Sequence, residues 1–569
     1  MNWKQIFKNN HEIFLILLIA AFLRFVGLNW GWPYQFHPDE WNMAHAITKL
    51  TWTNKLNPDF FAYGQFPLYL TYFSASAFNL ILRISLTQIN LSEATFFLRF
   101  WSAVAGVGIV YWVYLISQHL FDSRFSLIAA ALAAFTPGLI QNSHFGTTES
   151  ILTFCFLAII YFSLKIIEKP TRQNYLWAAF FSALALASKI TGLIFLFPLA
   201  TATGICFFSP VPRQEKLRIL GISFLALVFT VTLTSIFSPY LWLNFSESRR
   251  ILTYESLVAA GQIPVFYTRQ FFQTFPILFQ SQKIFPFALG WPLFIFGLIG
   301  LILTLAITIQ AFRQKKSPPL KWPLFLLNFA FWTYFLSQAF LFTKWTRFMA
   351  PVFPFFSIFS VWTIQSLAAK IKHRQLLIPY YISLISLLIF PGAVFFTLYL
   401  KPDIRLSASE WIYKNIPSGS QVLSESGNVV DLPVPLSYLP LPNYHLVPTS
   451  FDFYRLDEDP KMRSRLIAQL AQADYLIIPS RRVFANHQRL PEKFPLTAKY
   501  YQLLFSGQLG FKLIKEFSPF DFSLFSYHLS LFDDEGAEET WSVFDHPVIR
   551  IYQKTEKLTT KDYERLLQK

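Results

Sequence analysis

The chain has 569 residues, of which 54% are hydrophobic and only 14% are charged. In soluble proteins about a quarter of the residues are normally charged, so this composition excludes an ordinary soluble enzyme. The formal net charge of +16 does not indicate a nucleic-acid partner, because the Lys and Arg residues lie mostly in short loops between apolar runs, where membrane insertion accounts for them.

Charge is distributed unevenly along the chain. Apolar runs follow one another from Ile13 to Leu400, and charged residues become frequent only after Lys401. We therefore predict a transmembrane domain over residues 1–400 and a soluble domain over residues 401–569. The first apolar run, 13–30, is too long and too aromatic for the apolar part of a signal peptide and lacks a small-residue cleavage site, so we interpret it as a retained span.

A transmembrane helix needs about 20 apolar residues to cross the hydrocarbon core of a bilayer. One run of this kind, 66–82, is ambiguous, because Pro67 lies near its start and Asn79 lies within it. Eleven other runs are predicted as spans: 12–30, 97–118, 125–141, 150–167, 175–188, 190–208, 217–237, 287–311, 322–342, 349–368 and 376–398.

The basic loops indicate the orientation, because short loops rich in Lys and Arg stay in the cytoplasm. If the eleven runs cross and 66–82 does not, every basic loop lies on the side of the N-terminus. We therefore predict that 66–82 is re-entrant or interfacial. An odd number of spans then places residues 401–569 outside the cytoplasm, in a multi-pass plasma-membrane protein with a cytoplasmic N-terminus. The basic loops contain Lys4 and Lys8; Arg124; Lys165, Lys169 and Arg172; Arg213, Lys216 and Arg218; Arg313, Lys315, Lys316 and Lys321; and Lys370, Lys372 and Arg374.

Two short outer segments each combine histidine with carboxylate. The first, Phe36-His37-Pro38-Asp39-Glu40-Trp41, follows the first span, and the second, Asn142 to Ser150, contains His144 and Glu149. Helix capping explains part of both patterns, because Asp39 precedes a short amphipathic run and Thr148 or Glu149 precedes a span. Adjacent carboxylates at a membrane surface are nevertheless costly unless they are solvated, paired or used. Converging carboxylates can divide the work of a general base.

Several cations lie on the outer side, where the positive-inside rule disfavours them. Lys189 occupies a tight turn between two spans, and Lys344 and Arg347 occupy another. Each of them alone fits an interfacial anchor with an aromatic neighbour. Together they predict a site for an anionic group such as a phosphate, because Arg binds phosphate through two parallel bonds and Lys provides a point charge. Further candidates for this pocket lie on the long outer loop 238–286: Tyr240, Arg249, Arg250 and Arg269.

Cations around a phosphate, a carboxylate base and a lipid-facing setting favour one kind of reaction. A glycosyl group leaves a lipid phosphate and is attacked by an acceptor hydroxyl that a carboxylate has deprotonated. In-line attack would invert the anomeric carbon. The sequence contains no glycine-rich nucleotide-binding loop, which fits a lipid-linked donor rather than a nucleotide sugar.

Four short motifs carry a resemblance to a known family. They are His37-Pro38-Asp39-Glu40, the stretch from Ser143 to Ser150, the turn around Lys189, and the stretch from Thr346 to Pro354. In this combination and order the membrane domain resembles the GT-C membrane glycosyltransferases of the family 39 group, which includes protein O-mannosyltransferases and lipid A aminoarabinose transferases. The resemblance implies an inverting enzyme that uses a polyprenyl-phosphate sugar.

Carried over residue by residue, the resemblance implies that Asp39 is the general base and Glu40 its acidic neighbour. Glu149 takes the place of a second-loop acid that is more often Asp. Lys189 and Arg347, with Lys344 nearby, resemble the basic positions near the donor phosphate. One departure is the stretch Gln65-Phe66-Pro67-Leu68, where many relatives have Lys-Pro-Pro-Leu. The missing Lys argues against copying the aminoarabinose specificity.

Residues 401–569 alternate predicted helices and strands, which favours an α/β layer fold. A helix is expected to begin at Ser407 as its N-cap, and strands are expected over 421–424, 474–479 and 548–552. No catalytic cluster is evident in this domain. The acidic stretch Asp533-Asp534-Glu535, followed by Glu538-Glu539, is interpreted as a solvated loop rather than a metal site.

The alternative function is a transporter or flippase of a lipid-linked sugar. Such proteins favour charges within spans and paired repeats of broken helices, whereas here the notable charges lie at outer loop ends and no repeat occurs. A structural scaffold would leave the pooled acids and bases unexplained. The expected partners are the donor lipid, the bilayer, and a protein, lipid or glycan acceptor, without nucleic acid. No cofactor is required; a divalent metal stays open, because His37, Asp39, Glu40, His144 and Glu149 supply suitable ligand atoms without a diagnostic spacing.

Overall fold

The computed structural model describes residues 11–82, 88–314, 320–426, 429–437, 444–524, 527–530 and 533–568. The chain separates into two compact units. Unit 1 comprises Met1–Asn29, Asp39–Ile263 and Thr274–Thr397, and unit 2 comprises Trp30–Pro38, Pro264–Gln273 and Leu398–Lys569. Two short segments far from the C-terminus in sequence, 30–38 and 264–273, therefore belong to unit 2. Four of the basic-loop residues, Lys4, Lys8, Lys315 and Lys316, lie outside the described residues.

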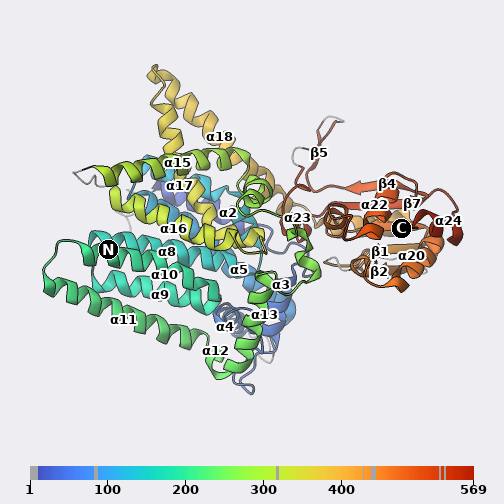
Figure 1. Ribbon diagram of the computed structural model, residues 1–569, viewed down its shortest axis with the longest axis horizontal. Coiled ribbons are helices and arrows are strands. Elements are labelled where there is room, and N and C mark those ends of the chain that lie inside the picture. Colours follow the sequence, from blue (N-terminus) through green and yellow to red (C-terminus); the bar gives the residue numbers. More distant parts are fainter. Residues whose placement is uncertain are drawn as a thin grey trace. The chain divides into compact units, whose positions relative to one another are not determined.

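Unit 1 is built from helices (Figure 1). Long helices such as α8, α9, α11, α15 and α17 carry its bulk, and shorter helical segments join them. In chain order the elements are α2 (His11–Phe25), α3 (Pro38–Thr48), α4 (Phe66–Ile81), α5 (Leu91–Ser117), α6 (Ser123–Ala134), α7 (Pro137–His144), α8 (Glu149–Glu168), α9 (Arg172–Ser188), η1 (Ile190–Phe195), α10 (Leu196–Phe208), α11 (Arg213–Phe237), α12 (Tyr240–Leu243), α13 (Phe245–Ala259), η3 (Gln280–Ile284), α14 (Phe285–Ala288), α15 (Trp291–Arg313), α16 (Lys321–Ala339), η4 (Thr346–Val352), α17 (Phe353–Ala368), η5 (Arg374–Leu376) and α18 (Leu377–Phe396).

Seven helices of the described chain are long and apolar enough to cross a membrane, and an eighth span results if α6 and α7, which meet at an angle of 54°, count as one. The predicted number of eleven spans is therefore not confirmed, because several helices fall short in length or in apolar content. Helix α9, for example, has 17 residues, and α4, which corresponds to the run 66–82, has 16. The seven candidates are Leu91–Ser117, Glu149–Glu168, Ile190–Phe208, Arg213–Phe237, Trp291–Arg313, Thr346–Ala368 and Leu377–Leu400.

Small residues allow the apolar helices to approach closely, as is common inside membranes. Helices α15 and α17 lie side by side (Figure 1). A Cβ atom on Gly300 of α15 would lie 1.8 Å from the carbonyl oxygen of Phe359 on α17. A Cβ on Gly392 of α18 would likewise lie 1.6 Å from the carbonyl oxygen of Phe135. Any side chain at these two positions would push the helices apart.

Unit 2 contains a five-stranded mixed sheet with the strand order β2-β1-β3-β7-β4. Strands β1 (Gln421–Glu425), β2 (Val447–Phe451) and β3 (Tyr475–Ile478) are parallel, with Val422 opposite Pro448 on one side and Tyr475 on the other. Strands β7 (Ile549–Lys554) and β4 (Phe511–Phe517) run antiparallel to their neighbours. The three predicted strands correspond to β1, β3 and β7. The remaining elements of unit 2 are η2 (Phe266–Phe271), η6 (Thr397–Leu400), α19 (Ile404–Asn415), η7 (Phe453–Arg455), α20 (Pro460–Gln472), α21 (Phe484–Gln488), α22 (Pro495–Phe505), the hairpin of β5 (Asp521–Leu524) and β6 (Tyr527–Ser530), α23 (Glu539–Val543) and α24 (Thr560–Leu566).

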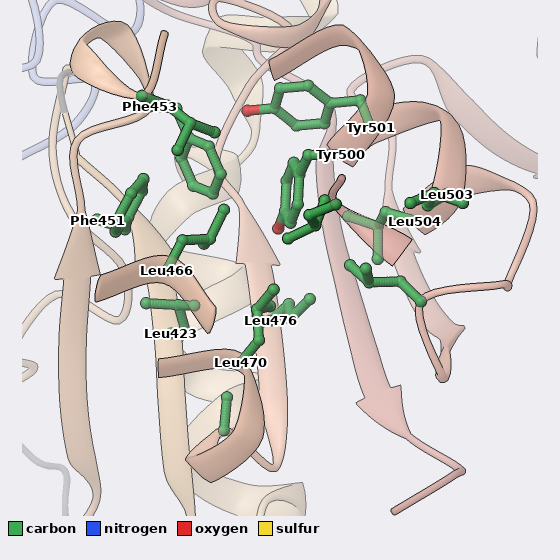
Figure 2. Packing of buried hydrophobic residues seen from close by; sticks show 14 of the residues in the cluster. Leu423, Phe451, Phe453, Leu466, Leu470, Leu476, Tyr500, Tyr501, Leu503 and Leu504 are labelled. Atoms are coloured by element: carbon green, nitrogen blue, oxygen red, sulfur yellow. The ribbon is translucent and has the colours of Figure 1, made fainter. Parts of the chain in front are cut away.

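One core of unit 2 forms where the sheet packs against helices α20 and α22 (Figure 2). The sheet contributes Leu423 and Leu476, and α20 contributes Leu466 and Leu470. The alternation of apolar residues along each strand and helix produces this contact, because each element buries one face. The predicted fold class, a polytopic helical membrane protein with a C-terminal α/β part, is confirmed.

Two details of the C-terminal part differ from the sequence prediction. Helix α19 begins one turn earlier than expected, because Asp403 rather than Ser407 is the N-cap and accepts a hydrogen bond from the backbone N–H of Arg405 at 2.8 Å. The acidic stretch is not a solvated loop: Asp534, Glu538 and Glu539 are buried. Each of these carboxylates has found a polar partner, which the sequence alone does not reveal.

The partners of this acidic stretch form a network within unit 2. His546 lies between two carboxylates, with Nε2 2.6 Å from Asp534 and Nδ1 2.5 Å from Asp545. Burial lowers the pKa of His546, but the two carboxylates outweigh it and raise the pKa to about 10, so this side chain is an imidazolium at neutral pH. Glu539 contacts Arg482 at 2.8 Å. Removing one partner of such a buried pair would leave an uncompensated charge in the interior.

Candidate active site

Glu40 is the most completely buried of the predicted acids. Proline fixes φ at a helix start, and α3 accordingly begins at Pro38 with Asp39 and Glu40 in its first turn. The Glu40 side chain accepts hydrogen bonds from Nε and Nη2 of Arg99 on α5, at 2.8 and 2.6 Å, and from the backbone N–H of Gly146 at 2.8 Å. Arg99 also donates to the carbonyl of Leu28 at 2.7 Å. Both oxygens of Glu40 are therefore engaged in the interior.

Gly146 connects the two outer acidic segments. Its N–H reaches Glu40 because the backbone approaches closely: an added Cβ atom would lie 2.7 Å from Cβ of Leu98 and 3.0 Å from Oε2 of Glu40. Only glycine fits at such a position without displacing a neighbour. The segment around Glu149 is thereby fixed against the first turn of α3.

Asp39, in contrast, is only partly covered. Its carboxylate forms an ion pair with Arg347 at the start of η4, and about a fifth of each side chain is exposed. The Arg347 guanidinium lies 5.0 Å from the ring centroid of Trp345, a cation–π contact that fixes the Arg side chain from the other side. Asp39 is thus a carboxylate beside a guanidinium, with part of its side chain open to solvent.

Glu149 pairs with Lys189 as the first residue of α8. The distance from Oε1 to Nζ is 3.0 Å, and the glutamate is almost fully buried. Thr148 occupies the N-cap position of this helix, but its hydroxyl lies 3.3 Å from Oε1 of Glu149 and does not cap the backbone. Lys189 follows the last residue of α9, where a 3-10 turn begins, as the predicted tight turn requires.

An aromatic ring joins the two ion pairs. The Nζ atom of Lys189 lies 5.2 Å from the ring centroid of Phe348, and Cζ of Arg347 lies 5.9 Å from the same centroid. On its other side, Nζ of Lys189 lies 5.0 Å from the ring of Tyr63. We call Asp39, Arg347, Glu149 and Lys189 the paired-charge site. It gathers residues from four separate parts of the sequence on unit 1.

Glu255 on α13 adds a further carboxylate near Lys189. Burial raises the pKa of Glu255, and the charge of Lys189 partly opposes this rise. The loop 238–286 therefore brings an acidic side chain, and not only its predicted cations, toward the paired-charge site. Arg250, one of those cations, is exposed and pairs instead with Glu247.

Lys344 differs from the two paired cations. It is buried, and its amine donates to the carbonyl of Phe342 at 2.9 Å. Among the described residues no carboxylate lies within ion-pair distance of this amine. Burial lowers the pKa of Lys344, which is the expected effect on an ammonium without a counter-ion. An arriving anion would therefore find a cation whose charge is not yet balanced.

The other predicted pocket residues do not join this cluster. His144 is buried, and its two ring nitrogens lie 2.9 Å from the carbonyls of Ile140 and Val26. Tyr240 donates its hydroxyl to the carbonyl of Lys55 at 2.7 Å. His37 and Arg269 belong to unit 2, where His37 packs its ring 4.4 Å from that of Phe544.

Two residues at the site were missed by the sequence prediction. Arg99 lies inside a predicted span, and the rule that a charge within a span needs a partner could have found it. Gln65 is fully buried; its backbone N–H donates to Ser238 and its side-chain oxygen accepts from the N–H of Tyr240, both at 2.9 Å. In the sequence, Gln65 differs from relatives only as the residue that replaces their Lys. In this chain it fixes the start of the long outer loop.

Among the described residues, no group of three or more His, Cys, Asp or Glu side chains comes close enough to hold a metal ion. Both oxygens of Glu40 contact Arg99 or Gly146, and Oε1 of Glu149 contacts Lys189.

Comparison with known proteins supports this description. Residues 77–242, from the end of α4 to α12, match the family described as dolichyl-phosphate-mannose-protein mannosyltransferase. No curated protein sequence matches the chain. The matched segment includes Arg99, Glu149 and Lys189, but neither Asp39 nor Arg347.

Solved structures with a similar chain course include three transferases. The archaeal oligosaccharyltransferase AglB from Archaeoglobus fulgidus, in complex with an inhibitory peptide and a dolichol-phosphate, has 14% identity, covers 88% of this chain and 73% of its own, and gives a TM-score of 0.48. ArnT from Cupriavidus metallidurans in the apo state has 12% identity, with 85% and 95% covered and a TM-score of 0.46. The arabinofuranosyltransferase AftD from Mycobacteria has 11% identity, with 96% and 41% covered and a TM-score of 0.39.

The sequence match lies on the part of the chain that carries four of the candidate spans. It includes two of the four motifs, the stretch from Ser143 to Ser150 and the turn around Lys189, and with them the Glu149–Lys189 pair of the paired-charge site. The predicted resemblance is confirmed over residues 77–242, and the apolar helices make the chain a multi-pass membrane protein that is similar to this glycosyltransferase family.

Proposed function

We propose that this protein is an inverting glycosyltransferase that moves a sugar from a polyprenyl-phosphate donor to an acceptor hydroxyl at the outer leaflet. One observation carries the proposal: Asp39, a charged and accessible carboxylate, lies beside Arg347 in a site that also holds Lys189. A base next to a cluster of cations suits transfer from a phosphate. The similarity to a family described as dolichyl-phosphate-mannose-protein mannosyltransferase supports a lipid-linked donor.

The proposed reaction is a single displacement. Asp39 accepts the proton of the acceptor hydroxyl as its oxygen attacks the anomeric carbon from the face opposite the phosphate. The bond between that carbon and the phosphate oxygen breaks, and the electron pair leaves with the polyprenyl phosphate. Cations that neutralise the developing charge lower the barrier. We assign this role to Arg347, Lys189 and Lys344.

The two other acids hold the site in place in this proposal. Glu40 has both oxygens engaged by Arg99 and Gly146, so we assign it as a positioning residue beneath Asp39. Glu149 holds the amine of Lys189 and orients it for the donor. The division of labour between the adjacent carboxylates thus follows from their burial, since only Asp39 is open to an acceptor.

The test uses purified full-length protein and a panel of radiolabelled polyprenyl-phosphate sugars, with protein, lipid and glycan acceptors offered in turn. Transfer from one of these donors, with inversion at the anomeric carbon determined by NMR of the product, is the expected result. Movement of the intact lipid-linked sugar across vesicles without transfer would instead favour a flippase. The distribution of the basic loops, read with the positive-inside rule, supports a site on the side of the membrane outside the cytoplasm.

Replacing Lys344 by Met is expected to weaken donor binding. Because a hydrogen bond to a charged group contributes about 1.5–3 kcal/mol, the KM for the lipid-phosphate sugar should rise about 10- to 100-fold, with a smaller effect on the KM for the acceptor. Lys216→Met is the matched control. The amine of Lys216 lies 5.6 Å from the Phe207 ring, and the amine of Lys344 lies 5.8 Å from the Phe342 ring. Lys216, however, is on a predicted cytoplasmic loop.

The pH dependence of donor binding provides a second measurement on Lys344. The amine binds phosphate as an ammonium, and burial lowers its pKa. Donor affinity should therefore fall as pH rises. The fall should occur at a lower pH than the pKa of an ordinary lysine, which is about 10.4. Lys344→Arg keeps its charge at every accessible pH, so the fall should disappear in that variant. An unchanged pH profile in Lys344→Arg would exclude Lys344 as a donor ligand.

A further inference from the structure

Unit 2 contains a cavity of about 480 Å³ at one edge of its sheet. Ser426 directly follows β1, Asp452 directly follows β2, and both line the cavity. In open sheets with parallel strands, ligands bind outside the carboxyl ends of the strands, where the chain reverses its direction of winding. In the order β2-β1-β3 this reversal falls between β1 and β3, so Ser426, at the end of β1, places one wall of the cavity beside it. The volume lies within the range of about 300–1,000 Å³ typical of small-molecule sites.

Aromatic side chains form the walls of this cavity. They come from the segment 264–273, from η7 after β2 and from the residue before α22: Phe266, Phe272, Tyr454 and Phe494. The rings of Phe266 and Tyr454 lie 4.8 Å apart at an angle of 53°, and Phe266 is 42% exposed. An exposed ring at a cavity mouth offers its negatively polarised face to the C–H groups of a ligand.

Arg269 is fixed in the centre of this wall. Its guanidinium lies 4.6 Å from the ring of Phe494 and 5.3 Å from that of Tyr454, and Nη1 donates to the carbonyl of Tyr454 at 3.0 Å. Burial and, to a smaller extent, the charge of Arg269 lower the pKa of His487 to about 4. The neutral His487 ring donates from Nδ1 to Val483 and accepts from Arg269 at Nε2, at 2.7 and 2.8 Å. Because these contacts already hold the Arg269 side chain in place, it loses little conformational entropy when a ligand binds.

The charges that line the cavity balance one another. Arg269 forms an ion pair with Glu458, and Arg455 forms one with Asp452 at 3.5 Å. Glu458 is more than half exposed and Asp452 more than a third, so their carboxylate oxygens remain accessible as acceptors. A site of zero net charge has no preference for an anion or a cation. Its carboxylates can instead accept from pairs of neighbouring hydroxyl groups.

We propose that this cavity of unit 2 binds a neutral saccharide, with a sugar ring stacked on Phe266 and its hydroxyls bonded to Glu458 and Asp452. An aromatic platform beside rigid, paired polar groups suits a ligand whose faces are C–H groups and whose edges are hydroxyls. A peptide acceptor would gain little here, because the described cavity presents neither a free backbone edge nor an unbalanced charge. The inference goes beyond the proposed function, since binding at unit 2 does not depend on transfer chemistry in unit 1.

The test measures saccharide binding to the purified full-length chain by saturation-transfer NMR and calorimetry. The probes are neutral oligosaccharides of mannose, glucose, galactose and arabinose, together with a Ser- and Thr-containing peptide and a uronic-acid oligosaccharide. At least one neutral oligosaccharide should bind. Phe266→Ala and Glu458→Gln should each weaken that binding about tenfold or more. Phe505→Ala is the matched control, because Phe505 is 40% exposed and does not line the cavity.

The outcomes separate this inference from the proposed function. Asp39→Asn should bind the saccharide as tightly as the wild type even where its transfer is lost. The proposal is overturned if no neutral saccharide binds at millimolar concentration, if the peptide or the uronic-acid oligosaccharide binds in its place, or if Phe266→Ala and Phe505→Ala weaken binding equally. Thermal unfolding of each variant identifies any loss of binding that results from a loss of fold.

Discussion

Asp39→Asn should abolish sugar transfer while the protein remains folded. General-base catalysis contributes about 10²- to 10⁴-fold to a rate, and an amide of the same size cannot accept the acceptor proton. The side chains of Asp39 and its partner Arg347 are each about a fifth exposed, so the charge that remains on Arg347 after the replacement is still partly solvated. The measurement is initial transfer rate at saturating donor, with thermal unfolding in detergent as the check on folding.

Two comparisons make this result specific to Asp39. Glu247→Gln removes a carboxylate from an exposed ion pair on α13 and should leave transfer unchanged. Asp39→Glu keeps the charge but moves it by one methylene, and it should retain part of the activity. If Asp39→Asn transfers sugar at the wild-type rate, the assignment of Asp39 as general base is wrong, although the protein can still be a glycosyltransferase.

Arg99→Met should destabilise the protein more than any other single substitution at the site. Removing one partner of a buried ion pair costs about 3–5 kcal/mol, because the remaining charge stays in the interior without compensation. Glu40, the remaining partner, is fully buried and would lose both hydrogen bonds from Arg99 while it keeps the N–H of Gly146. The measurement is the unfolding midpoint of the full-length protein in detergent. Transfer should fall as well, since the first turn of α3 carries Asp39.

The double variant Glu40→Gln with Arg99→Met tests the cause. A neutral amide still accepts from Gly146, and replacing both charges of a buried pair is often tolerated, so stability should largely return. Arg218→Met is the matched control. Arg218 contacts Glu215 through Nε and Nη2 at 2.9 and 2.6 Å, nearly the same distances as in the buried pair, but at an exposed site where little change is expected. Equal losses for Arg99→Met and Arg218→Met would contradict the role of burial.

Local features of this protein could be predicted from the sequence, whereas pairings between distant residues could not. The strands at 421–425 and 475–478 and the turn at Lys189 follow from local patterns of apolar residues and turn residues. The acidic motif around Asp39 was recognisable because charges are rare near apolar runs. The packing of the helices determines which cation each acid contacts. The spacing of residues in the sequence does not predict these partners.

The buried acids show this limit most clearly. The sequence treats Asp39 and Glu40 as equivalent neighbours, yet one turn of helix directs the first to an open surface and the second into the interior. Similarly, the stretch from Asp533 to Glu539 has the composition of a solvated loop, but distant residues such as His546 and Arg482 neutralise it. The predicted number of spans is not confirmed for a related reason: apolar content identifies buried segments, but it does not distinguish a full crossing from a shorter helix.

The ring of Phe348 is shared by the two halves of the paired-charge site. Arg347 and Phe348 are consecutive residues of the short helical segment η4, and the amine of Lys189 lies near the same ring. A substitution at this one apolar position therefore removes a contact from the cation of each ion pair, although Phe348 itself carries no charge.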